Sequence, residues 1–191
     1  MTIPRFHDER NGHLPEKFFL ALGHLQYAYT SLEVNLTCQV RSLVLVPPYD
    51  DPDHRFLYER VSAILGGMRM AVLKDTIKRL LRVTEAPTEL TDYVNVIFAQ
   101  LSEIQYLRNR LTHYNTGRWF SRRGHFTNTD IEVARETPKA VTIKFTYDAL
   151  DAARHDLHAI AYYMEQAIPN EDHGMILDDP AWQYKPSMLV R

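Results

Sequence analysis

The sequence is poor in several features that mark particular classes of protein. Its 191 residues include a single cysteine, Cys38, so neither an intrachain disulfide nor a cysteine-based zinc cage can form. Because Cys38 lies in a helical pattern, we expect a free thiol in the core. The sequence also lacks an H-E-x-x-H motif, and we expect neither a metal nor another cofactor.

Charge of one sign and long apolar runs are also missing. Lys and Arg number 22 against 24 Asp and Glu, so any contact with nucleic acid must be local. No apolar run reaches membrane-spanning length, and the N-terminal segment MTIPRFHDERNGH has no apolar stretch of the kind a secretion signal needs. The expectation is a cytoplasmic protein with no membrane partner.

What the sequence does contain is helical periodicity. Apolar residues recur every three or four positions in four segments, which run from about 14 to 46, 54 to 83, 88 to 114 and 147 to 168. Pro47 and Pro48 end the first of these segments. Gly66 and Gly67 interrupt the second and indicate either a bend or a close helix crossing.

Between the third and fourth helical segments the period changes to alternation. Ile131 and Val133 form one alternating run, and Val141, Ile143 and Phe145 form another beyond the residues ETPK, which predicts a β-hairpin.

The fold class predicted from this order is mainly α, a four-helix bundle with a small β-hairpin insertion between helices three and four. We expect one domain over 1–168, with the insertion at about 118–146, and an irregular C-terminal tail over 169–191.

Three polar residues stand out near the end of the third helix. Arg108 continues the apolar spacing of that helix, so it either finds a partner inside the bundle or extends its charged end to water. Asn109 lies four residues before His113, so the amide could orient the imidazole. His113 falls in the last turn, where the helix dipole favours the protonated ring.

The segment YLRNRLTHYN, from Tyr106 to Asn115, resembles the motif of the HEPN superfamily (higher eukaryotes and prokaryotes nucleotide-binding domains). In that family an arginine and a polar residue precede a histidine on a late helix of a helical bundle, and Arg108, Asn109 and His113 match these positions. Tyr114 follows the histidine directly and Asn115 comes second. One branch of toxins paired with nucleotidyltransferases has its tyrosine at that second position.

The resemblance implies a metal-independent endoribonuclease that works as a homodimer, as a toxin or a defence effector, with an antitoxin or another regulatory protein as a further partner. His113 would act as the general base or acid, Arg108 would stabilise charge on the phosphate, and Asn109 would orient the histidine. Glu33, beside the apolar stripe of the first helix, and Tyr114 are candidate supporting residues. Glu33 could pair with Arg108 or simply face solvent.

The insertion combines cationic and aromatic side chains, which is typical of single-stranded RNA binding and equally of a charged sheet edge that resists aggregation. The candidate RNA-binding residues are Arg118, Arg122, Arg123 and Trp119.

Two alternatives stay open. His155 and His158 could be a pair of metal ligands or ordinary exposed histidines. The chain as a whole could also be a catalytically silent, dimeric HEPN-like module that binds nucleotide, RNA or a protein. In the enzyme, Arg108 and His113 should line an open cleft, whereas in the silent module internal hydrogen bonds should consume them.

Overall fold

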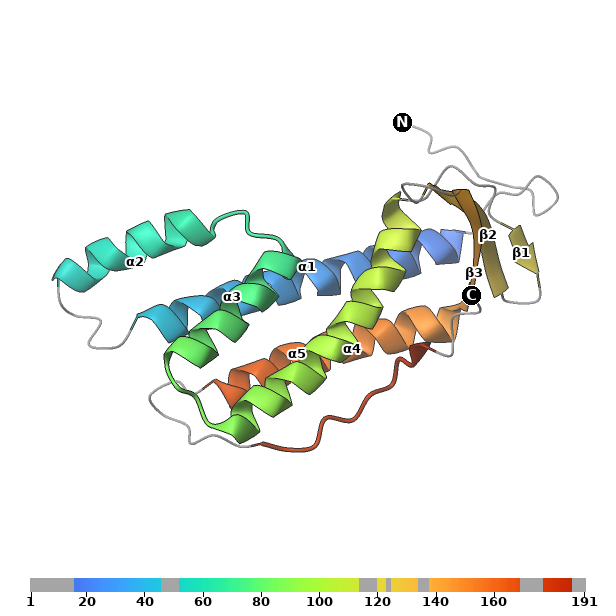
Figure 1. Cartoon of the computed structure of the whole chain (residues 1–191). Helices are drawn as coiled ribbons and strands as arrows, with labels where there is room; N and C mark the ends of the chain where they lie inside the picture. The colour runs from blue at the N-terminus through green and yellow to red at the C-terminus, as the bar shows by residue number, and fades with distance from the viewer. Residues whose placement is uncertain are drawn as a thin grey trace. The chain divides into compact units, whose positions relative to one another are not determined.

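A computed structural model describes residues 16–45, 52–113, 120–122, 125–133, 138–168 and 177–186, and gives side chains for 16–45, 55–112, 145–168 and 177–186. These residues form a mainly helical protein, as the sequence predicts (Figure 1). No described helix is both long enough and apolar enough to cross a membrane. The helices are α1 (Glu16–Val44), α2 (Pro52–Leu65), α3 (Met70–Val83), α4 (Thr88–His113) and α5 (Tyr147–Ala167).

The segment predicted as one helix over about 54–83 is two helices, and that prediction is wrong. Gly67 has φ +81°, a left-handed conformation that glycine adopts without steric cost and that ends a right-handed helix. The Met68 amide donates to the carbonyl of Leu65 (3.1 Å), which closes the turn after α2. The described part of the chain therefore has five helices where the sequence predicts four.

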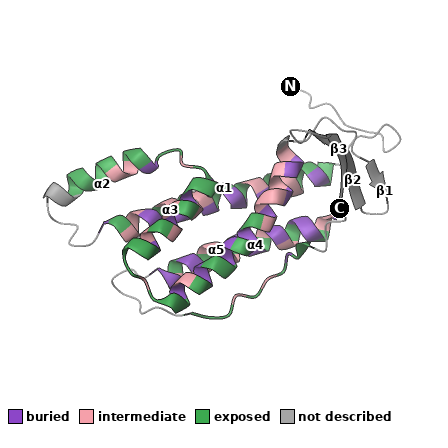
Figure 2. Cartoon of the chain, in the orientation of Figure 1, coloured by how far each residue is buried: buried purple, intermediate pink, exposed green. Residues whose placement is uncertain are grey.

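The split changes which apolar residues are buried. In α3 the buried residues are Met70, Leu73, Ile77 and Leu81, a regular helical stripe. In α2 every residue from Arg55 to Arg60 is exposed, and so is Ile64 (Figure 2). The apolar stripe predicted to run through both segments is therefore continuous only within α3.

Three strands lie between α4 and α5. They are β1 (Phe120–Arg122), β2 (His125–Val133) and β3 (Pro138–Thr146), paired antiparallel in the order β1-β2-β3. The register places Ile131 opposite Ala140. Where β3 ends, the Ala149 amide donates to Thr146 Oγ1 (3.2 Å), which caps the first turn of α5.

The contacts divide the chain into two compact units. One contains the described residues of Met1–Ala28, Ser102–Asp156 and Trp182–Arg191, and the other those of Tyr29–Leu101 and Leu157–Ala181. In the first unit Phe18 packs against Phe145, with ring centroids 5.9 Å apart. The core of the second unit is built from apolar residues of α1, α3, α4 and α5, among them Leu36, Ile77, Ile97 and Ile160.

Cys38 differs from its prediction, because its side chain is a free thiol on the surface and not in the core. The buried residues of this part of α1 include Leu36 and Val40. Cys38 lies two positions from each of them, about 200° around the helix, and so faces away from the core.

The C-terminal segment is held by a buried carboxylate. Asp156 of α5 is 1% exposed, and its two oxygens accept the backbone amides of Gln183 (2.8 Å) and Tyr184 (2.7 Å). The Tyr184 side chain is fully buried. Residues 177–185 form no helix or strand, and the described part of this irregular segment from Trp182 on belongs to the first unit.

Candidate active site on helix α4

The last three turns of α4 are anchored by buried leucine and isoleucine. Ile104, Leu107 and Leu111 are 3% exposed or less, and their spacing of three and four residues fixes the rotation of the helix. With these residues inward, Arg108 comes to a half-buried position at the edge of the core. The apolar spacing predicts Arg108 in the seam itself, whereas the buried residue is the adjacent Leu107.

Arg108 is held by two amide oxygens. Its Nε donates to Oε1 of Gln26 on α1 (2.9 Å), and its Nη1 donates to Oδ1 of the adjacent Asn109 (3.2 Å). An amide oxygen fixes the plane of a guanidinium without cancelling its charge, as a carboxylate would. These two bonds therefore orient the guanidinium of Arg108.

Gln26 was not predicted as a site residue. It follows the buried Leu25 and precedes the buried Ala28 and Tyr29, so it lies at the edge of the apolar stripe of α1. Its polar side chain at the edge of an apolar stripe is the signal that the sequence offers for this residue. The position alone does not identify Arg108 as its partner.

Asn109 has a different contact from the expected one. Its carbonyl oxygen accepts a hydrogen bond from Arg108. The sequence predicts that the same amide orients His113. The backbone of His113 ends α4, and its side chain lies outside the described side chains. Orientation of the imidazole by Asn109 stays a prediction.

The neighbouring Arg110 points inward. It is 3% exposed, and its guanidinium carbon lies 5.1 Å from the centroid of the Tyr106 ring. A cation over an aromatic face is a stabilising arrangement for a buried arginine. Of the two arginines in the motif segment, Arg108 is thus the more accessible to a substrate.

Glu33 has a structural role within the second unit. Its Oε1 accepts the backbone amide of Met70, the first residue of α3, at 3.0 Å. A helix N-terminus exposes unpaired amides and a partial positive charge, both of which attract a carboxylate. Glu33 thus caps α3, and Gln26 provides the amide partner on α1 for Arg108.

The other predicted site residues fall where the structure does not describe side chains. Tyr114, Arg118, Trp119 and Arg123 lie outside the described residues. Arg122 ends β1 and pairs with His125 in the sheet register, and only its backbone is described. Their roles in RNA binding and support stay predictions.

The histidines of α5 form no metal site with the other described side chains. His155 and His158 are exposed, and Asp156 between them is turned inward to the C-terminal segment. His155 Nε2 lies 2.8 Å from Arg154 Nη2. A hydrogen bond from Arg154 lowers the pKa of the Asp151 carboxyl. Among the residues with described side chains, no three His, Cys, Asp or Glu residues are placed to share a metal ion.

Comparison with protein-family models, with curated proteins and with solved structures finds no match to this chain. The chemical interpretation therefore depends on the site itself. An oriented guanidinium and a histidine backbone at the negative end of the helix dipole lie five residues apart on one helix, about 140° around its axis. The oriented guanidinium can contact a phosphodiester, and a joint contact with the His113 imidazole stays a prediction.

Proposed function

We propose that this chain is a metal-independent endoribonuclease of the HEPN type, with its site at the end of α4. The observation that carries the proposal is the Arg108 guanidinium, fixed by Gln26 and Asn109 through neutral oxygens. Preorganised positive charge is what stabilises a phosphorane-like transition state. A helical bundle, with the hairpin insertion predicted from the change of period, is part of this proposal.

The reaction is an attack of the ribose 2′-oxygen on the adjacent phosphorus. His113 removes the proton of the 2′-hydroxyl, or donates a proton to the departing 5′-oxygen, as the 2′,3′-cyclic phosphate forms and the 5′-oxygen bond breaks. Arg108 stabilises the charge on the phosphate oxygens. One motif supplies one histidine, so two copies of the chain in a symmetric homodimer would supply both an acid and a base.

The test is cleavage of RNA by purified protein in the presence of EDTA. His113→Ala and Arg108→Ala should each lower the rate by at least about a hundredfold, a loss within the usual range for acid–base and electrostatic groups. Products should carry 2′,3′-cyclic phosphate ends, and DNA, which has no 2′-hydroxyl, should stay intact. Circular dichroism should show that both variants remain helical.

The second candidate function is a catalytically silent module that binds RNA, nucleotide or protein. The bonds from Arg108 to Gln26 and Asn109 favour it, because internal hydrogen bonds of this arginine are what the silent module predicts. The two functions separate on His113→Ala. If this variant cuts RNA as fast as the wild type, or if the wild type cuts none, the assignment of His113 is wrong and the silent module becomes the better account.

A further inference from the structure

Positive charge is concentrated on and next to helix α3, although the chain as a whole has no excess of positive charge. The chain has a formal net charge of −2, with 22 Lys and Arg. The segment 69–83 holds five of those 22 and one acidic residue, Asp75. The five basic residues are Arg69, Lys74, Lys78, Arg79 and Arg82.

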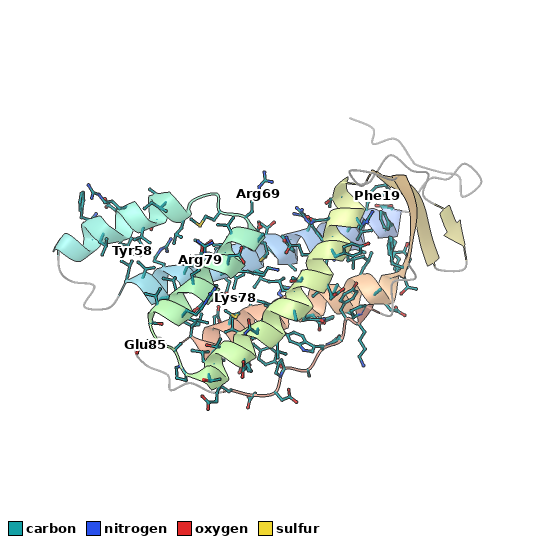
Figure 3. The ribbon with its side chains drawn as sticks, viewed as in Figure 1. Phe19, Tyr58, Arg69, Lys78, Arg79 and Glu85 are labelled. Carbon is teal, nitrogen blue, oxygen red and sulfur yellow. The ribbon has the colours of Figure 1, made fainter. Side chains whose placement is uncertain are left out.

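Three of these residues form a line along one face of the helix. Lys74, Lys78 and Arg82 are spaced by four, so they lie one above another, with about 6 Å of helix rise between neighbours. We call these three residues the basic stripe. Burial of the apolar face of α3 fixes the rotation of the helix, so the direction of the stripe is set by the core. Figure 3 shows Lys78 and Arg79 on α3, with Arg69 at its N-terminal end.

Four of the five basic residues lack a counter-charge among the described side chains. In the part of the chain whose side chains are described, Arg69, Lys78, Arg79 and Arg82 make no ion pair. The Lys78 ammonium lies 5.8 Å from the Phe98 ring centroid, and Arg82 Nε donates to the Lys78 carbonyl (3.3 Å). Neither contact supplies negative charge.

The pKa of Lys74 reflects its position in this stripe. Burial, followed by repulsion from Lys78, lowers the pKa of Lys74, against a smaller opposite effect of Asp75. A half-buried ammonium next to a second cation is unfavourable in the free protein. An anion bound along the stripe would offset the repulsion between Lys74 and Lys78.

We propose that the basic stripe binds the phosphate backbone of single-stranded RNA, outside the motif of α4 and outside the insertion. The choice of RNA as the polyanion rests on the proposed function. A strand of RNA carries one negative charge per nucleotide at regular spacing, which suits cations repeated along a helix. An anionic membrane fits less well, because a surface-binding helix must insert its apolar face and that of α3 is buried in the core.

The experiment measures binding of a fluorescently labelled single-stranded RNA to the full chain carrying His113→Ala, which prevents cleavage. The test variant adds Lys78→Gln and Arg82→Gln. A matched control adds Arg55→Gln and Arg60→Gln on α2, which remove the same charge from exposed positions. The test variant should weaken binding at least about fivefold at low salt and reduce the slope of log K against log salt by about 1.4, or 0.7 per lost phosphate contact. The control should resemble the parent.

Equal losses in test and control variants would overturn the proposal, because net charge would then explain binding without the stripe. Binding to phosphatidylserine vesicles that depends on Lys78 and Arg82, with no effect on RNA, would also overturn it. Thermal melting followed by circular dichroism checks that the variants fold.

The two proposals fail separately. If the chain with native His113 cuts no RNA while the stripe variant loses RNA binding, the nuclease is wrong and the stripe stands. If cleavage depends on His113 while the stripe variant binds RNA normally, only the stripe is wrong.

Discussion

Helices α3 and α4 carry positive charge in opposite ways. On α4, Arg108 is half-buried and oriented by Gln26 and Asn109, and Arg110 is buried beside Tyr106. On α3, Arg79 and Arg82 are exposed and make no ion pair with any described side chain. A fixed cation suits a step that depends on geometry, whereas an open row of cations suits affinity, which depends mainly on charge.

The largest expected effect comes from exchanging arginine and lysine on the two helices. Arg108→Lys keeps the charge but loses the planar fork that Gln26 and Asn109 orient, so RNA cleavage should fall about a hundredfold. Lys78→Arg is the matched change on α3 and should alter RNA affinity less than about twofold, since an open stripe depends on charge. Cleavage and binding assays of both variants check this. Equal sensitivity of the two positions would remove the distinction.

A smaller effect is expected at Gln26, a positioning residue for Arg108. Gln26→Leu removes the acceptor of the Arg108 Nε and should lower kcat about tenfold with little change in KM, because orientation matters most in the transition state. Gln26→Glu keeps an acceptor in place and should recover part of the loss. A fall in Tm that tracks the fall in kcat would instead indicate a purely structural role.

The smallest expected effect concerns Lys74. Its lowered pKa means that the unfolded chain binds this proton more tightly than the folded one. Stability should therefore rise with pH between that lowered pKa and 10.5, and below that range the charged ammonium costs stability. Lys74→Met should raise Tm at neutral pH by a few degrees at most, roughly the response to a change under 1 kcal/mol. The Lys74→Met variant should also show a weaker dependence of stability on pH in the alkaline range, and it should bind RNA less tightly. A lower Tm would show that Lys74 stabilises the free protein.

The helical character of the chain could be predicted because apolar periodicity is a local property. The stripe of α1 is an example, since Phe18, Leu25, Leu32 and Leu36 are all buried as its spacing predicts. The division between α2 and α3 could not be settled in the same way. Gly66 and Gly67 are compatible with a bend, a crossing or a break, and only the left-handed φ of Gly67 decides for a break.

The candidate site shows the same limit. The sequence places Arg108 near the core and leaves open whether it finds a partner or extends to water, and the structure supplies partners. Which residue serves depends on how α1 and α4 face each other, which spacing within a helix does not encode. Glu33 is the better electrostatic match to an arginine, yet it caps α3, while the neutral Gln26 contacts Arg108.

The carboxylate of Asp156 also has a consequence for how the protein is made. The first compact unit combines residues of α1 with Tyr184, so it joins segments that lie far apart in the sequence. A ribosome adds about 5–20 residues per second, and domains generally fold as units once their residues have emerged. Asp156 stays without these two donors until Gln183 and Tyr184 have emerged from the ribosome. A transcript truncated before Tyr184 would leave a buried carboxylate without these donors, and its product should be a substrate for proteolysis.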